Sequence, residues 1–474
     1  MKSNKGFKPI NNYYLKRLFN TNINHKKVAK LWQKANQTTD AKIEKFTIGN
    51  DPIYDLQLAR YDVLGSLAHI TMLAEVGLLK KEELSPLCQE LKVILASIDA
   101  GEFEIEVGME DVHSQIEYLL TQKLGDLGKK IHAGRSRNDQ VLVDLKLFMR
   151  AEIQEIAEAV EKLFNLLLTK SEAHKKDLLP GYTHLQIAMP SSFGLWFGAY
   201  AESLVEDVEL LEAAFRLANK NPLGSGAGYG SSFPLDRQLT TDLLGFESPH
   251  VNVVNAQLSR GKTEFYLLTA ISQIASTLSK LAMDVCLYNS QNFGFIELPD
   301  SLTTGSSIMP HKKNPDVAEL LRGKANKLKA LPNQLHLLTS NLPSGYHREF
   351  QLTKELLMPA IEEILDGLEI THYLVEHMKV KSDLLNHDKY DLLFSVEEVN
   401  RLVVQGVPFR EAYQQIGKMI EEKQFDGSQR NLHHTHLGSI GNLGLDQIQA
   451  QKDTAYQRFG FEKVNQAIDR LIAS

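Results

Sequence analysis

The chain has few cysteines, no long apolar run and no excess of positive charge. Its two cysteines, Cys88 and Cys286, exclude a disulfide framework or a cysteine-based zinc site and predict two buried free thiols. No apolar run reaches the about 18 residues that a membrane span needs. With 52 basic and 59 acidic residues the formal net charge is −7, which argues against a nucleic-acid partner.

Glycine and proline are also absent between Lys262 and Phe293, which predicts one long helix there. In this segment and in 153–167 and 204–218, apolar residues alternate three and four positions apart, the seam pattern of a helical bundle. We find no convincing run of alternating strand residues. The sequence therefore predicts an all-α fold with a long central helical bundle. Because such helices exceed the usual length, we expect self-association, the alternative being a bundle inside a monomer.

The length of 474 residues predicts more than one core. We expect an N-terminal helical domain with a flexible start (1–134), a central long-helix domain (135–375) and a small helical C-terminal domain (376–474). The polar, basic first residues contain no apolar signal core, so we expect a cytoplasmic protein.

The strongest candidate for chemistry is segment 305–316, which reads GSSIMPHKKNPD. It gathers two hydroxyls, two ammonium groups and an amide between a glycine and two prolines, so as a loop it could close over an anion. The alternative is the solvated start of a helix with a serine cap, because Asp316 and Glu319 would suit a first turn.

Two other polar segments are candidates. Arg135 and Arg137 in RSRND (135–139) suit bidentate recognition of carboxylates, although a charged turn between helices is the alternative. Thr183-His184 follows Pro180-Gly181, and a histidine titrates near neutrality, although a lone histidine is more often structural.

Two motifs are rejected. The glycines between Gly224 and Gly230 are not followed by Lys-Ser/Thr or preceded by a strand, so a flexible connection or close backbone packing is favoured over a nucleotide loop. His433, His434 and His436 lie in a polar stretch, and we predict no metal site there.

Together these segments resemble the fumarase/aspartase superfamily and, within it, the argininosuccinate lyase branch. Segment 305–316 is similar to the signature loop of the superfamily. The similarity runs in the family's order from about Leu31 to about Gly417. The segments similar to the branch are EDVHSQIE (110–117), HAGRSRNDQ (132–140), PGYTHLQ (180–186), NPLGSGA (221–227), FPLDR (233–237), FGFIELPD (293–300) and GVPFREAY (406–413).

The resemblance implies a nearly all-helical three-domain subunit in a homotetramer, with active sites shared between subunits and no cofactor or metal. It implies β-elimination through a carbanion, releasing fumarate. Ser306 matches the family's base, Lys312 and Asn314 match the groups that hold the developing dianion, and His184, with its partner Glu319, matches the acid that protonates the leaving nitrogen. The resemblance leaves open whether His184 is instead the base. Substrate-binding positions fall on Arg135, Ser136, Arg137, Asn138, Thr183, Gln186, Tyr346, Gln351 and Lys354.

Some positions depart from the family's pattern. Asp51 stands where the family has a serine near the substrate, and we count it among the substrate-binding residues. A usual Ser-Asp-Arg-Asp stretch is replaced by residues that include Arg260 and Lys262. We therefore expect a small-molecule lyase that cleaves argininosuccinate to arginine and fumarate. The alternatives are an N-acylated argininosuccinate, another fumarate-releasing lyase of the superfamily, or a non-catalytic structural protein.

Overall fold

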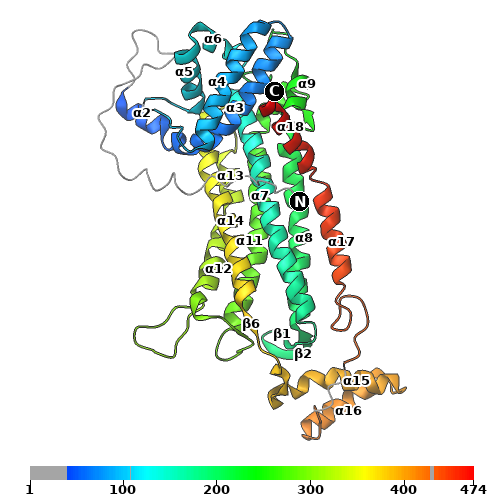
Figure 1. The fold of residues 1–474 in the computed structure, drawn as a ribbon. Coiled ribbons are helices and arrows are strands. Elements are labelled where there is room, and N and C mark those ends of the chain that lie inside the picture. Colours follow the sequence, from blue (N-terminus) through cyan, green and yellow to red (C-terminus); the bar gives the residue numbers. More distant parts are fainter. Residues whose placement is uncertain (1–39, 107, 428–431) are drawn as a thin grey trace.

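A bundle of four long helices dominates the molecule (Figure 1). A computed structural model describes residues 40–106, 108–427 and 432–474, so the start that we predicted to be flexible lies outside the described residues. The bundle helices are α7 (Arg137–Ala173), α8 (Phe193–Ala218), α11 (Lys262–Tyr288) and α14 (Thr353–His377). The 37 residues of α7 span about 55 Å at 1.5 Å per residue.

The bundle is held by the apolar seams that the sequence predicted. On α7, the seam residues from Ile153 to Leu167 are at most 1% exposed, and those of α8 and α11 are likewise buried. Full burial of each such side chain contributes on the order of 1.5–3 kcal/mol. The three predicted helices are thus confirmed. We call the end of the bundle where α7 begins the upper end, and the opposite end the lower end, as in Figure 1.

Further helices cover both ends and the flanks of the bundle. At the upper end α3 packs on α4, α5 and α7, while α12 packs along α11, and α17 along α8. The α-helices outside the bundle are α2 (Ala41–Ile48), α3 (Asp51–Glu75), α4 (Lys81–Asp99), α5 (Val112–Leu124), α6 (Asp126–Lys129), α9 (Arg237–Leu243), α10 (Val253–Leu258), α12 (Asp316–Leu328), α13 (Leu331–Leu338), α15 (Ser395–Val404), α16 (Phe409–Glu421), α17 (Leu445–Gln457) and α18 (Phe461–Ala473). The 3-10 helices are η1 (Lys130–His132), η2 (Asp300–Leu302), η3 (Arg348–Leu352), η4 (Leu384–Asn386) and η5 (Asp388–Phe394).

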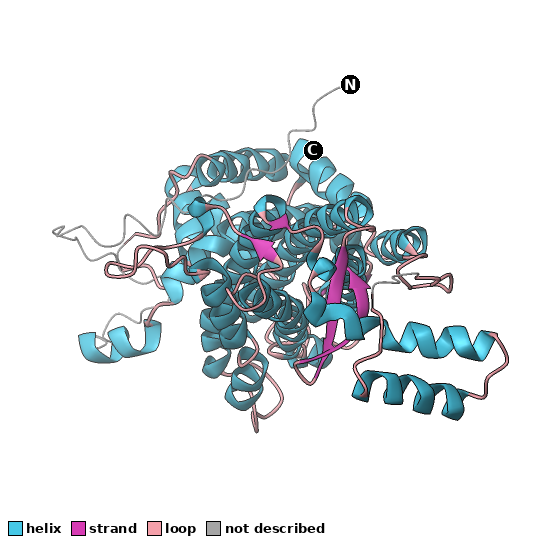
Figure 2. Cartoon of the chain, turned by 90° about the horizontal axis from the view of Figure 1, so that it is seen from below, coloured by secondary structure: helices cyan, strands magenta, loops and turns pink. Residues whose placement is uncertain are grey.

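The structure is mainly helical, in keeping with the predicted all-α fold, and it also contains short strands that we had not predicted. An antiparallel hairpin of β1 (Leu178–Thr183) and β2 (Gln186–Ser192) follows α7 at the lower end (Figure 2). Two pairs of two-residue strands complete the set: β3 (Lys220–Asn221) is parallel to β4 (Ser248–Pro249), and β5 (Ile296–Glu297) is antiparallel to β6 (Lys379–Val380).

The C-terminal part of the chain has two different positions. Helices α15 and α16 extend from the lower end and enclose a small core of their own around Val399, Ala412 and Ile416 (Figure 1). Helices α17 and α18 run back along the bundle to the upper end. Cys88 and Cys286 are free, as predicted, but they are only half-buried. In the described part of the chain no helix has the length and apolar character needed to cross a membrane.

Candidate functional site

The residues predicted for the site lie in two groups at opposite ends of the bundle. The upper group belongs to the starts of α3, α7 and α14 and the residues just before them. It consists of Asp51, Arg135, Ser136, Arg137, Asn138, Tyr346, Gln351 and Lys354. The lower group belongs to the hairpin, the 305–316 segment and the start of α12. It consists of Thr183, His184, Gln186, Ser306, Lys312, Asn314 and Glu319.

The centre of the upper group is an ammonium held between two carboxylates. Lys354 is 3% exposed, and its Nζ atom lies 2.5 Å from Oδ1 of Asp51 and also pairs with Asp55. Burial, aided by the negative charge of Asp55, raises the pKa of Asp51 to about 6. Burial lowers the pKa of Lys354, but the two carboxylates outweigh it and the pKa is raised. Lys354 therefore stays charged, and Asp55 joins this group of side chains although we had not predicted it.

The RSRND segment forms the start of a helix rather than a loop. Ser136 caps α7: its hydroxyl accepts the N–H of Asn138 at 3.3 Å, and its own N–H donates to Asp139 at 2.8 Å. Arg137 is half-buried and pairs with Asp111, which caps α5 in turn. The guanidinium of Arg137 thus faces the N-terminal start of α5. Arg135 instead points into the core, where it is 8% exposed and donates to Ser66.

The glycine-rich segment packs closely, which is the second of the two alternatives that the sequence left open, and it supports the same helix start. The N–H groups of Gly224 and Gly226 each donate to Oδ2 of Asp139 at 2.9 Å. Burial raises the pKa of Asp139 to about 6, although these backbone donors act in the opposite direction. The signal that could have identified Asp139 is the Ser136-x-x-Asp139 spacing of a capping box.

Gln351 and Tyr346 border the same region. The side-chain amide of Gln351 donates to the carbonyls of Thr47 and Ile48, at 3.2 and 2.9 Å, which ties η3 to the end of α2. The ring of Tyr346 lies 6.2 Å from that of Phe350. Gln351 is therefore engaged by the backbone at the end of α2, whereas the ring of Tyr346 lies beside Phe350 of η3.

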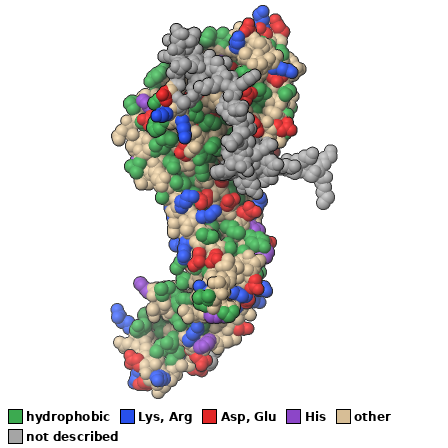
Figure 3. Space-filling model, turned by 90° about the vertical axis from the view of Figure 1, so that its left-hand side faces the viewer, with side chains coloured by type: hydrophobic (Ala, Val, Ile, Leu, Met, Phe, Trp, Pro, Cys, Tyr) green, Lys and Arg blue, Asp and Glu red, His purple; other side chains and the backbone are tan. Residues whose placement is uncertain are grey.

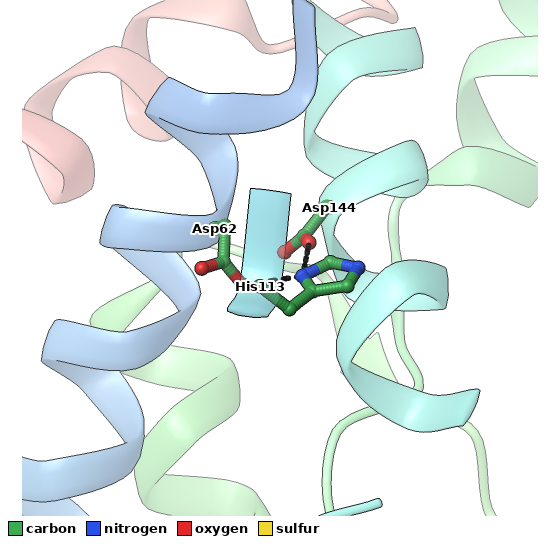
Figure 4. A group of neighbouring side chains, drawn as sticks. All are labelled: Asp62, His113 and Asp144. Atoms are coloured by element: carbon green, nitrogen blue, oxygen red, sulfur yellow. Dashed lines mark hydrogen bonds and ion pairs between the residues drawn. The ribbon is translucent and has the colours of Figure 1, made fainter. Parts of the chain in front are cut away.

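Behind the upper group three buried side chains meet from three helices (Figure 4). Nδ1 of His113 lies 3.0 Å from Asp62 and 3.5 Å from Asp144. Burial lowers the pKa of His113, but the charge of Asp62 outweighs this and raises it. Burial, together with the charge of Asp62, raises the pKa of Asp144 well above its usual value. These contacts were not predicted, because each residue lies on a different helix.

The same three residues have the donor set and the spacing of a cation site, with ligand atoms within 4.8 Å of one another. However, Gln140 donates to Asp62 at 2.6 Å, and the positive charge of Arg135 acts on both carboxylates. With His113 protonated, side chains already supply two positive charges for two carboxylates. The cluster therefore fits a buried ion network better than a metal site.

In the lower group, the hairpin turn carries the predicted histidine. Thr183 pairs with Gln186, and the two residues between them, His184 and Leu185, have φ angles of +54° and +57°. This is the left-handed geometry of a tight hairpin turn, which L-residues adopt at a cost of about 1–2 kcal/mol each. All four residues are exposed, so the turn presents His184 to its surroundings.

The 305–316 segment contains the predicted loop, and the alternative helix start follows it at Asp316, as α12. Backbone hydrogen bonds between Thr304 and Asn314, of 3.1 and 2.8 Å, close its neck. Within the loop, Oγ of Ser306 accepts the N–H groups of Ile308 and Met309, at 3.4 and 3.2 Å. Ser306 therefore caps a turn inside the loop, whereas Pro315 precedes α12 without a side-chain cap.

The predicted pair of His184 and Glu319 does not form within one chain. Among the described residues, no hydrogen bond or ion pair joins these two side chains, which lie on the hairpin turn and on the first turn of α12. Glu319 is exposed on the first turn of α12, and Lys312 is exposed in the loop. The lower and upper groups are separated by the length of α7, so a single chain does not bring the predicted site together.

The two cations that departed from the family's pattern differ in exposure. Arg260 is 5% exposed, donates to the carbonyl of Phe350 at 3.1 Å and pairs with Glu264 at 3.3 Å. Lys262 is exposed at the start of α11. The guanidinium of Arg260 is thus committed within the chain. Of the rejected histidines, His434 pairs with Glu397 at 3.0 Å.

Comparison with known proteins gives one consistent result. A family model described as lyase matches residues 27–329. Curated relatives include an argininosuccinate lyase of Bacteroides thetaiotaomicron, which is 59% identical over 94% of this chain and 99% of that protein. An argininosuccinate lyase of Parabacteroides distasonis is also 59% identical with the same coverage, and one of Stenotrophomonas maltophilia is 40% identical over 81% of this chain and 89% of that protein.

Solved structures share the fold. An EDDS lyase variant with bound fumarate has a TM-score of 0.71 at 19% identity, covering 92% of this chain and 97% of that one. A fumarate lyase/delta crystallin from Brucella melitensis bound to cobalt has a TM-score of 0.66 at 18% identity, covering 85% and 91%. At these identities the likeness concerns the fold alone.

Proposed function

Because this chain belongs to the argininosuccinate lyase family of carbon–nitrogen lyases, we propose that it cleaves argininosuccinate to arginine and fumarate. The observation that carries the proposal is the 59% identity to argininosuccinate lyases over 94% of the chain. Polar groups of the kinds that the reaction needs, a hydroxyl, a histidine, ammonium groups and guanidinium groups, gather at the two ends of the bundle.

The elimination begins with the removal of a proton from the carbon beside a carboxylate. Ser306 takes this proton, the resulting electron pair forms the double bond of fumarate, and the carbon–nitrogen bond breaks. The N–H groups of Ile308 and Met309, which point at Oγ of Ser306, support this role because they stabilise an alkoxide. Lys312 and Asn314, on the same loop, hold the carboxylate on which negative charge develops.

The leaving guanidino nitrogen needs a proton as the bond breaks. His184 donates it from the hairpin turn, and Glu319 orients and stabilises the imidazolium. The exposed turn, held in a left-handed geometry, supports this assignment because strained exposed residues are frequent at functional sites. Thr183 and Gln186, at the ends of the turn, contact the substrate from the same side.

The upper group binds the rest of the substrate. Arg137 and Asn138, at the N-terminus of α7, receive a carboxylate, where the helix dipole adds to the guanidinium charge. Asp51 and Tyr346 border the amino-acid end of the substrate. Ser136, Gln351 and Lys354 support the region through the cap, the backbone contacts and the ion pairs described above. Arg135 points into the core rather than toward the substrate, and it supports the region through the buried network of side chains.

The active site is completed by other copies of the chain, in a homotetramer. The separation of the two groups along α7 supports this, because one chain cannot bring both to the same substrate. Apolar side chains exposed on the bundle helix α11 and on the flanking helices α12 and α13 also support self-association, including Met283, Leu320 and Leu337. Figure 3, which shows the left-hand side of the molecule in Figure 1, displays hydrophobic side chains among charged ones.

The activity is tested by mixing the purified protein with argininosuccinate and following fumarate by its ultraviolet absorbance. We expect rapid release and a loss of about 10²–10⁴-fold in Ser306→Ala, with Ser307→Ala as the matched control. An active Ser306→Ala would contradict the assigned base. If the well-folded wild type released no fumarate, the proposed substrate would be wrong, and N-acylated argininosuccinates would be tested next.

Sharing of the site is tested with two inactive variants, Ser306→Ala in the lower group and Arg137→Met in the upper group. Oligomers reassembled from equal amounts should regain about one quarter of the wild-type turnover, because sites with both residues intact form again. If mixing restored nothing while the native mass showed mixed tetramers, the site would lie within one chain. The domain boundaries and the cytoplasmic location proposed from the sequence need their own tests, by limited proteolysis and cell fractionation.

A further inference from the structure

Arg260 lies beside the upper group without belonging to it. It is 5% exposed and directly precedes the turn into α11, in the stretch that departs from the family's pattern. This turn packs closely on its surroundings: Gly261 has a φ angle of +76°, and an added Cβ there would lie 2.8 Å from the side chain of Thr339 and 3.4 Å from the ring of Phe350. The missing side chain of Gly261 thus allows Arg260 to approach η3.

The guanidinium of Arg260 holds the backbone of η3. Its Nη2 donates to the carbonyl of Phe350 at 3.1 Å, and the same carbonyl accepts the hydroxyl of Thr353 at 2.8 Å. The guanidinium carbon also lies 5.9 Å from the centre of the Phe350 ring. Gln351 comes next in the chain and Lys354 follows shortly afterwards, and both are members of the upper group. The hydrogen bond to this carbonyl therefore fixes the backbone from which both side chains extend.

Behind Arg260 a line of buried charges runs into the bundle. Nε of Arg260 lies 3.3 Å from Oε1 of Glu264, whose side chain is fully buried. Within the described part of the chain neither oxygen of Glu264 accepts a hydrogen bond, so neighbouring cations balance its charge. The second cation is Lys146 of α7: burial lowers its pKa to about 7, and the charge of Glu264 acts in the opposite direction. Lys146 also donates to the carbonyl of Leu217 at 2.9 Å, near the end of α8, so this line of charges joins Arg260 to two bundle helices.

These contacts could serve the fold alone, by tying the start of α11 to η3. A buried ion pair is weak evidence for stability, however, because apolar side chains of similar volume often stabilise a protein as well. The position of this pair favours a second purpose, since Arg260 also acts on Asp51. Burial raises the pKa of Asp51 to about 6, and the charges of Lys354 and Arg260 oppose this and favour the carboxylate form. Arg260 thus bears on three members of the upper group: Asp51, Gln351 and Lys354.

We propose that Arg260 is a positioning residue for the half of the substrate that leaves as arginine. It holds η3 and the start of α14, so that the upper group keeps its geometry, while Glu264 and Lys146 hold Arg260. This inference rests on the function proposed above, in which the upper group binds the arginine half and the lower group binds the half that becomes fumarate. The departure from the family's pattern then changes the support of the site and adds no contact to a modified substrate.

The two products separate the two groups in an experiment, because arginine inhibits by occupying the upper group and fumarate by occupying the lower one. Inhibition by arginine is followed through fumarate absorbance, and inhibition by fumarate through the release of arginine. In Arg260→Met we expect KM for argininosuccinate and the inhibition constant of arginine to rise about tenfold or more, because small displacements of positioning groups have effects of this size. The inhibition constant of fumarate should not change. Arg216→Met, which removes an exposed arginine of α8, is the matched control and should alter none of the three constants.

A second variant decides the question if Arg260→Met does not fold. Arg260→Met/Glu264→Gln removes both members of the ion pair, so no unbalanced carboxylate remains, and Lys146 can lose its proton because its pKa is about 7. It should show the same rise in the inhibition constant of arginine.

A residue that served only the fold would change the amount of active protein and leave all three constants as in the wild type, which would overturn the inference. An equal rise in the inhibition constants of arginine and fumarate would also overturn it, because the upper group would not be affected selectively. If the wild type cleaved no argininosuccinate, the proposed function itself would fail.

Discussion

The Nζ atom of Lys354 lies 2.5 Å from Oδ1 of Asp51, and the same ammonium pairs with Asp55. This contact joins the first turn of α14 to the first turns of α3, which are about 300 residues away in the sequence. It fixes the distance between two of the elements that surround the upper group. The charges of this group therefore contribute to the fold as well as to the proposed binding of the substrate.

Replacing Lys354 by methionine should destabilise the protein strongly. Two neighbouring carboxylates would lose their shared cation, and removing one partner of a buried pair costs about 3–5 kcal/mol. We expect this loss in the free energy of unfolding measured with urea, together with loss of turnover. Lys313→Gln, which breaks the exposed pair with Asp300, should leave the unfolding midpoint unchanged. An unaltered midpoint in Lys354→Met would show that the pair does not stabilise the fold.

The stability of the protein should depend on Asp51 in a defined pH range. The pKa of Asp51 is raised to about 6 from a usual 3.8, so the folded chain holds this proton more tightly than the unfolded chain. Unfolding then releases the proton, and the free energy of unfolding falls as the pH rises from about 4 to about 6. Relative to Asp51→Asn, the wild type should lose at most about 3 kcal/mol across this range. A constant difference between the two proteins from pH 4 to 7 would refute the shift.

Gly226 should not tolerate a side chain. Its φ angle is +59°, and an added Cβ would lie 2.8 Å from the carbonyl oxygen of Gly230. Because its N–H also donates to Asp139, we expect Gly226→Ala to lower the free energy of unfolding by about 1–3 kcal/mol. The control is Gly323→Ala on α12. There an added Cβ would meet no atom within 4 Å apart from its own helix backbone, and alanine should stabilise the fold by about 0.5–1 kcal/mol. Equal effects of the two changes would contradict this account.

His184→Asn should separate catalysis from folding. Asparagine adopts the left-handed conformation of this turn readily, so the unfolding midpoint should stay the same. Turnover should fall by about 10²–10⁴-fold, because the proton donor is lost. Leu185→Gly relieves strain at the next position and should raise the free energy of unfolding by about 1 kcal/mol, with turnover retained. Full activity in His184→Asn would remove His184 from the mechanism.

The sequence was sufficient to predict the long helices, because their apolar spacing is a local pattern. Residues 153–167, 204–218 and 271–285 all lie within bundle helices. The hairpin was missed because LLPGYTHLQIAMPSS (178–192) lacks strict alternation, and its tight turn is built from His184 and Leu185 rather than from glycine or asparagine. The pairing of Thr183 with Gln186 on either side closes this turn, and sequence propensity alone does not predict it.

The residues of the candidate site stay predictions from the sequence, and their arrangement in space could not be predicted from it. Segments 135–139 and 305–316 are distinguished in the sequence by their charges and hydroxyls. The contacts among Asp62, His113 and Asp144 depend on how three helices pack, and no local sequence pattern predicts such packing. The hydrogen bond of Arg260 to Phe350 and its ion pair with Glu264 could not be predicted either, because the sequence does not show whether an arginine is buried.

The uninterrupted α7 also restricts how the length of the chain can change. Each residue of an α-helix turns the chain by about 100° and advances it by 1.5 Å, so deleting one residue midway would rotate Arg137 relative to everything that follows Ala173. The seams with α8 and α14 would lose their register at the same time. Insertions and deletions are therefore compatible with the molecule outside the bundle, as in the projecting α15 and α16, whose small core is independent of it. The rigid helix makes the spacing between the two polar ends a fixed property of the scaffold.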